Sequence, residues 1–122
     1  MLRRIAQLLK LWRNVHSQLR LNSFFMELLL IEEKICRPGR SYGHSLLRGL
    51  SVLAQRRFAS LDDPLSISGK IFSAATVLQR EEIRRVAASS RELAKAALRY
   101  EAENDLEEAD RCWQDILGYK VY

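Results

Sequence analysis

The stretch of sequence that decides the fold runs from Leu93 to Leu117 and reads LAKAALRYEAENDLEEADRCWQDIL. Its first eight residues place small alanines between the bulky ends Leu93 and Tyr100, and its last part spaces alanine, tryptophan and isoleucine along one helix face. Small residues let two helices approach closely, and aromatic side chains fill the groove between them. Asn104 stands between the two parts, and asparagine tolerates a left-handed turn position. The stretch therefore predicts an antiparallel helical hairpin over residues 90–117.

Helical spacing of apolar residues continues upstream over four further segments, residues 2–20, 24–36, 41–60 and 66–88. In residues 2–20 the apolar side chains share one broad face and the basic and polar side chains share the opposite one, which is the pattern of an amphipathic helix. The second segment is apolar nearly all round, so we expect it to be the most buried helix. No segment alternates apolar and polar residues as a strand does. The sequence therefore predicts an all-α bundle of five or six helices.

Capping residues mark where these helices begin. Asn22 or Ser23 can cap the second segment and Ser41 can cap the third, because their side chains can accept hydrogen bonds from free backbone N–H groups. Ser89 and Glu92 have the spacing of a capping box, in which the serine bonds forward and the glutamate reaches back. We therefore expect one helix to end and another to begin between residues 88 and 91, with a single unbroken helix through them as the alternative.

Length and composition indicate one globular domain covering residues 1–122. The chain is 48% hydrophobic and 29% charged, and a domain of this length buries about two-thirds of the surface that its unfolded form exposes. Cys36 and Cys112 are far apart in sequence, which predicts two reduced thiols and a cytoplasmic protein. The first 26 residues are rich in arginine and contain no acidic residue, which is also typical of a mitochondrial presequence. Mitochondrial localisation is therefore the alternative.

Charge divides the chain into a basic half and an acidic half. Residues 1–60 carry eleven basic and three acidic side chains, whereas residues 61–122 carry nine basic and twelve acidic ones. A basic half joined to an acidic half can pair with itself, within one chain or between two copies. It can also present its basic surface to nucleic acid, anionic lipid or an acidic protein.

The hairpin stretch resembles a single tetratricopeptide repeat. In these repeats a bulky residue, a small pair and an aromatic residue line the first helix, and an alanine and an aromatic residue on the second helix close the hairpin. The matching positions are Leu93, Ala96, Ala97, Tyr100, Ala109, Trp113 and Ile116. The turn departs from the repeat pattern, because Asn104 stands where glycine is usual.

The same stretch is similar to the helical hairpin of small enterobacterial virulence regulators, the AraC-negative-regulator and PerC-like families. The shared residues are Ala94, Ala97, Glu101, Ala109 and Trp113. Members of these families act by binding transcription regulators or nucleoid proteins and carry out no chemistry. The resemblance covers about a quarter of the chain, and it implies a non-enzymatic regulator that binds a protein partner.

The sequence contains no motif that indicates catalysis or a bound cofactor. Glycine-rich phosphate loops, serine elbows and metal-ligand spacings are missing, and no apolar run approaches the ~20 residues of a membrane span. His16 falls on the apolar face of the first helix and is expected to be structural. Neither His44 nor the cysteines have a sequence-local partner that would activate them. We therefore expect no catalytic residue, no metal, no cofactor and no small-molecule substrate.

These observations favour an adaptor or regulatory protein that binds a protein partner through a helical surface and that can also self-associate. The residues expected either to form the docking surface or to build the core are Leu93, Tyr100, Leu106, Ala109 and Trp113. The first alternative is nucleic-acid binding by the basic half, through phosphate contacts from Arg3, Lys10, Arg13, Arg37, Arg40, Arg48 and Arg56. The second alternative is attachment to a membrane surface by the amphipathic first helix.

Overall fold

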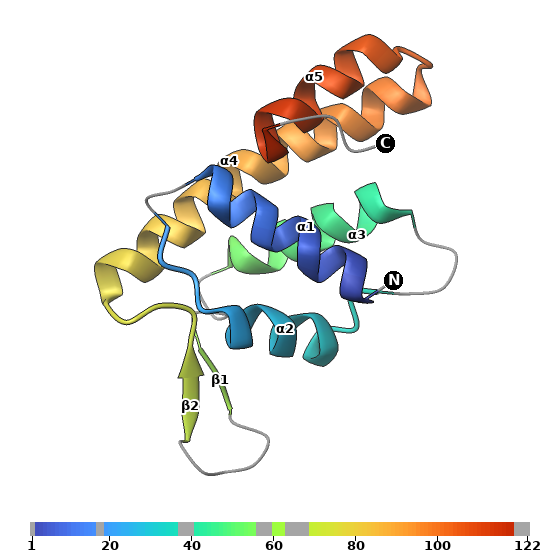
Figure 1. Ribbon diagram of the computed structural model, residues 1–122. Helices are drawn as coiled ribbons and strands as arrows, with labels where there is room; N and C mark the ends of the chain where they lie inside the picture. Colours follow the sequence, from blue (N-terminus) through green and yellow to red (C-terminus); the bar gives the residue numbers. More distant parts are fainter. Residues whose placement is uncertain (1, 17–18, 37–40, 56–59, 63–68, 119–122) are drawn as a thin grey trace.

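The computed structural model describes residues 2–16, 19–36, 41–55, 60–62 and 69–118. Five helices and two short strands follow one another in this part of the chain (Figure 1). Their bounds are α1 (Leu2–Val15), α2 (Ser23–Glu32), α3 (Tyr42–Leu53), β1 (Ser60–Asp62), β2 (Lys70–Phe72), α4 (Val77–Ala102) and α5 (Leu106–Leu117). The expected all-α fold is confirmed, and it ends in the expected helical hairpin, made of α4 and α5.

The apolar core lies where α1 meets α2, α3 and the hairpin. Ile5, Leu9 and Trp12 of α1 are completely buried, as the helical spacing predicts. Val15, which continues the same apolar face, is partly exposed at the end of the helix. Helix α2 buries five of its ten residues, although Phe24 and Ile31 remain exposed.

Three helix ends are set by local backbone bonds and come earlier than expected. Helix α1 ends at Val15, because the backbone turns at His16, whose carbonyl accepts a hydrogen bond from the Leu19 N–H at 2.9 Å. Helix α2 ends at Glu32, because Lys34 adopts a left-handed conformation with φ 49°. The Ile35 N–H then donates to the Leu30 carbonyl, which closes the helix end and turns Ile35 into the core. Helix α3 ends at Leu53 instead of near residue 60.

Residues 60–62 and 70–72 form a small antiparallel ladder, whereas residues 70–72 were expected to lie in a helix. Ser60 pairs with Phe72 and Asp62 with Lys70, and Gly69 takes a positive φ of 77° just before β2. The backbone carbonyl of Ser73 accepts a hydrogen bond from the Asn22 N–H at 2.7 Å. Because this segment is tied to the start of α2, helix α4 begins only at Val77 and not near residue 66.

Helix α4 runs unbroken through Ser89 and Glu92, so the helix boundary expected there is wrong. Its 26 residues span about 39 Å at ~1.5 Å per residue. The capping box of this helix is at its true start, where Thr76 and Gln79 exchange side-chain and backbone hydrogen bonds at 3.1 and 3.2 Å. Ser90 is buried inside the helix, where its hydroxyl accepts a hydrogen bond from the indole N–H of Trp12 at 2.9 Å. A tertiary contact thus stabilises the helix where local spacing suggested a break.

Candidate protein-binding groove

The five residues expected on the docking surface separate into core and surface. Ala109 and Trp113 are 2% and 4% exposed and belong to the core. Leu93 and Tyr100 are partly buried on α4, and Leu106 at the start of α5 is 60% exposed. The hairpin residues therefore mainly hold the hairpin together, and only some of their atoms are left for a partner.

A groove lies beside the hairpin, where α1, the start of α3, the last turn of α4 and α5 meet. Its volume is about 270 Å³. The lining residues are Leu8 of α1, Ser41, Tyr42, Gly43 and Leu46 at the beginning of α3, Glu101 of α4, and Trp113 and Leu117 of α5. Leucine and tryptophan side chains make its surface mainly apolar, and Tyr42, which is 47% exposed, stands at its edge.

Gly43 sets how closely α3 approaches the hairpin. A Cβ atom at this position would lie 3.1 Å from Cζ2 of Trp113 and 3.2 Å from Cδ2 of Leu98. Both distances are shorter than ordinary van der Waals contact, so a side chain here would push α3 away from the hairpin. A glycine inside a predicted helix is the one sequence signal that marked this close approach.

Two polar arrangements border the groove. The indole N–H of Trp113 donates to Oε1 of Glu101 at 3.1 Å, which links the two helices of the hairpin. The Ser41 hydroxyl caps α3 by accepting from the His44 backbone N–H at 3.2 Å, and it also bonds Nδ1 of His44 at 2.7 Å. The described residues provide no ion-pair partner for Glu101, which is exposed.

The serine–histidine contact is accounted for by helix capping. The two residues are three apart at a helix start, and serine is a preferred residue at that position. A hydrolytic site would also need a group that orients the histidine and donors for an oxyanion. In the described ranges His44 bonds only to Ser41, so the geometry supports a cap.

Cys112 lacks the lowered pKa of a reactive thiol, and the acidic side chains of the described part of the chain form no metal site. Burial raises the pKa of the Cys112 thiol, and the nearby carboxylates of Asp115 and Glu108 raise it further. A nucleophilic cysteine needs the opposite shift. Across residues 2–16, 19–36, 41–55, 60–62 and 69–118, no group of three or more His, Cys, Asp or Glu side chains is arranged to hold a metal ion.

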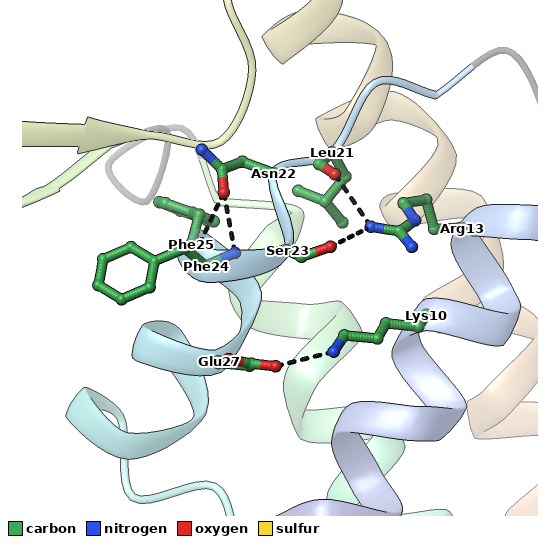
Figure 2. A network of polar contacts seen from close by, with 8 residues as sticks. All are labelled: Lys10, Arg13, Leu21, Asn22, Ser23, Phe24, Phe25 and Glu27. Atoms are coloured by element: carbon green, nitrogen blue, oxygen red, sulfur yellow. Dashed lines mark hydrogen bonds and ion pairs between the residues drawn. The ribbon is translucent and has the colours of Figure 1, made fainter.

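The basic residues of α1 make contacts between helices (Figure 2). The ammonium of Lys10 forms an ion pair with Glu27 of α2 at 2.7 Å. The guanidinium of Arg13 donates to the Ser23 hydroxyl at 2.7 Å and to the Leu21 carbonyl at 3.3 Å, beside the Asn22 side chain that caps α2. These two cations therefore help to hold α1 against α2.

The other predicted phosphate-binding residues differ in whether they contact an acidic residue. Arg48 on α3 lies 3.8 Å from a carboxylate oxygen of Glu33, whereas Arg3 is exposed and has no ion pair with a described residue. Arg37, Arg40 and Arg56 lie outside the described residues. Of the four that the structure places, three contact neighbouring residues, so they do not form one continuous free basic surface.

Two further surfaces were not found from the sequence. A second groove of about 400 Å³ lies between α1 and α2, bordered by Arg3, Lys10 and Ile31 among others. An exposed apolar patch is formed at the start of α4, where Leu78 is 83% exposed near Val77. Leu78 has helical spacing with the apolar residues that follow it, but the core-facing stripe of α4 begins only at Ile83.

The apolar side chains of Ile5, Leu8, Leu9 and Trp12 on the first helix pack in the core. Among the described helices, none combines the length and the apolar character needed to cross a bilayer. Comparisons with protein-family models, with curated proteins and with solved structures find nothing that matches this chain. Function is therefore argued from the geometry of its surfaces.

Proposed function

We propose that this chain is a non-enzymatic adaptor or regulatory protein that binds a protein partner through the groove beside the hairpin. The observation that carries the proposal is an open, mainly apolar groove of about 270 Å³ built by four helices. An apolar groove between helices is a common receptor for a side chain or a helical segment of another protein.

The size and openness of the groove favour a protein segment over a metabolite. Pockets for drug-sized ligands and cofactors have volumes of about 300–1,000 Å³ and bury most of the ligand's surface. This groove lies just below that range and is open to solvent, and its side-chain polar groups are chiefly Glu101 and the hydroxyls of Ser41 and Tyr42. Such a lining can bury one large apolar side chain of a partner.

We also propose that the protein is located in a reducing compartment such as the cytoplasm. Both cysteines are free thiols, and Cys36 and Cys112 are each only partly buried. A reducing compartment keeps such thiols from forming bonds between molecules.

Site-specific photo-crosslinking in the native host tests the groove directly. The photoreactive residue p-benzoylphenylalanine replaces Tyr42 in one variant and Leu78 in the other. Both positions are exposed, and they belong to different helices: Tyr42 begins α3, and Leu78 lies in the first turn of α4. We expect one discrete protein adduct from position 42 that is absent from position 78.

The captured protein is then purified, and its affinity for the wild-type chain and for Tyr42→Ala is measured by calorimetry. We expect the alanine variant to bind at least fivefold more weakly, because an edge tyrosine that packs on a partner contributes about 1 kcal/mol or more. Adducts that form only at position 78, or an unchanged affinity of Tyr42→Ala, would show that the groove is not the docking surface.

A further inference from the structure

We infer that the segment bound in the hairpin groove places a lysine or arginine beside a large apolar residue, with the cation on Glu101 and the apolar side chain on the groove floor. The inference rests on the proposed function, and it specifies the chemistry of the partner. Three observations carry it: the charge of the hairpin end, the position of Glu101 and the size of the apolar floor.

The hairpin end is mainly acidic, with one basic residue, Arg99, in the last turn of α4. Residues 100–110 contain six carboxylates and neither lysine nor arginine. Arg111, which follows directly, is engaged by Glu108 at 2.8 Å and by Glu107 at 3.9 Å. A partner that approaches this end of the molecule therefore meets negative potential, which attracts cations and repels acidic segments.

Glu101 is the carboxylate of this end that also borders the groove. Its Oε1 accepts from the indole N–H of Trp113, so the carboxylate is held in place beside the apolar floor. The other oxygen has no ion-pair partner among the described residues. A cation placed there would form a charge-assisted hydrogen bond with an already oriented acceptor.

Helix polarity adds to this preference. Glu101 lies in the last turn of α4, two residues before Glu103 at the helix end. The carboxyl end of a helix carries a partial negative charge, so acidic side chains there are unfavourable and cations are favourable. A lysine or arginine from the partner relieves this local excess of negative charge.

The apolar floor lies directly beside this carboxylate. Leu46, Trp113 and Leu117 are buried residues whose atoms form the floor, and Tyr42 stands at its edge. The volume of about 270 Å³ is enough for one large apolar side chain. The two halves of the recognised motif must therefore be close in the partner sequence, as neighbours or within one helical turn.

An unbiased selection tests the inference. A phage library of random heptapeptides is selected on the folded wild-type protein, with Tyr42→Ala used to remove peptides that bind elsewhere. We expect the enriched peptides to carry a lysine or arginine within four positions of Leu, Ile, Met, Phe or Trp. A representative synthetic peptide is expected to shift the indole N–H signal of Trp113 in an NMR titration and to leave that of Trp12 unchanged.

Two conservative variants distinguish a specific role of the Glu101 carboxylate from an effect of the overall negative charge of the hairpin end. Glu101→Gln keeps an oxygen that accepts from Trp113 but removes the charge, so we expect the peptide to bind about tenfold or more weakly. Glu103→Gln removes a charge at an exposed position that does not line the groove, and it should change the affinity by less than about threefold.

The outcomes distinguish this inference from the proposed function. Peptides that shift Trp113 but are acidic or purely apolar, or that bind Glu101→Gln as well as wild type, would overturn the inference and leave groove binding intact. Failure to enrich any peptide that shifts Trp113 would count against both. A Trp113 shift that grows with protein concentration alone would identify a second copy as the occupant and would also overturn the inference.

Discussion

At the scale of single residues, the close approach of α3 to the hairpin depends on one glycine. Gly43 lies against the ring of Trp113, which is buried and held by its hydrogen bond to Glu101. A flexible neighbour could move aside for a larger residue, but a packed indole ring has little freedom to do so. The same helix contains Gly49, whose surroundings are looser, because a Cβ atom there would lie 3.5 Å from its nearest neighbour, Cδ1 of Leu9.

We therefore expect Gly43→Ala to destabilise the protein by about 1–3 kcal/mol, the usual cost of overpacking. Gly49→Ala is the matched control, and we expect it to be neutral or stabilising by up to ~1 kcal/mol, because alanine favours the helix and no neighbour has to move. Urea unfolding followed by circular dichroism at 222 nm measures both. Equal effects of the two substitutions would contradict the role assigned to Gly43.

A buried hydrogen bond joins Trp12 of α1 to Ser90 of α4, two residues that are 78 positions apart in the sequence. Ser90→Ala leaves the indole N–H of Trp12 buried without its acceptor, and we expect a loss of about 1–3 kcal/mol. Ser89→Ala, at the exposed neighbouring position of the same helix, should stay within about 0.5 kcal/mol of wild type. The difference between the two midpoints of chemical denaturation measures the contribution of the bond, and equal midpoints would show that the bond adds no stability.

His16 contributes a pH dependence, because burial lowers its pKa below the ordinary value of 6.5. The unfolded chain then binds a proton more readily than the folded one, so this part of the stability is complete above pH 6.5 and is lost as the pH falls below it. We expect His16→Asn to flatten the decrease of the unfolding free energy between pH 7 and pH 5. Denaturant titrations at several pH values check this, and a variant with an unchanged slope would refute it.

At the scale of elements, the turn between α4 and α5 depends on a residue that tolerates a left-handed backbone. Asn104 has φ 60°, and Asp105 follows as the cap of α5, where its side chain accepts from the Glu108 N–H at 3.4 Å. The departure from the usual glycine is therefore compatible with the hairpin. Asn104 is somewhat strained in this left-handed conformation, whereas a glycine there would not be.

We expect Asn104→Ala to destabilise the hairpin by about 1 kcal/mol, since alanine is less tolerant of a positive φ. Asn104→Gly should be equal to wild type or slightly more stable, because the gain in native conformation is offset by the greater freedom of glycine in the unfolded chain. Thermal unfolding followed by circular dichroism ranks the three proteins. Alanine and glycine variants of equal stability would show that the turn is not under this strain.

At the scale of the whole molecule, α1 is a central part of the core and not an attachment. Its buried side chains contact a core to which every helix contributes, and Lys10 and Arg13 are bonded to α2 (Figures 1 and 2). Removing several large buried side chains costs about 2–5 kcal/mol for each. The total exceeds the ~5–15 kcal/mol by which a protein of this kind is stable.

We therefore expect a chain that lacks residues 1–16 to lose cooperative unfolding and most of its helical signal in circular dichroism. The full chain should remain in the supernatant when mixed with neutral phosphatidylcholine vesicles, since the apolar face of α1 is covered. A truncated chain that stays folded, together with binding of the full chain to those vesicles, would instead support attachment through the first helix.

Local patterns allowed much of the fold to be predicted but little of the groove. The caps at Asn22 and Ser41 and the left-handed turn at Asn104 are confirmed, because each depends on residues within a few positions of one another. The predicted break at Ser89 is wrong, because the neighbouring serine bonds to a distant tryptophan. Leu106 is exposed as a docking residue would be, but Trp113 serves mainly as core.

By itself, the sequence determined the helices, their buried faces and the final hairpin, since the 3.6-residue period and the capping residues act over one or two turns. Only the tertiary structure decided that Lys10 and Arg13 bind α2, that α4 is continuous, and that α1, α3, α4 and α5 enclose a groove. These features depend on contacts such as Gly43 against Trp113, whose residues are far apart in the chain. Packing brings such residues together, and no local pattern encodes which of them will meet.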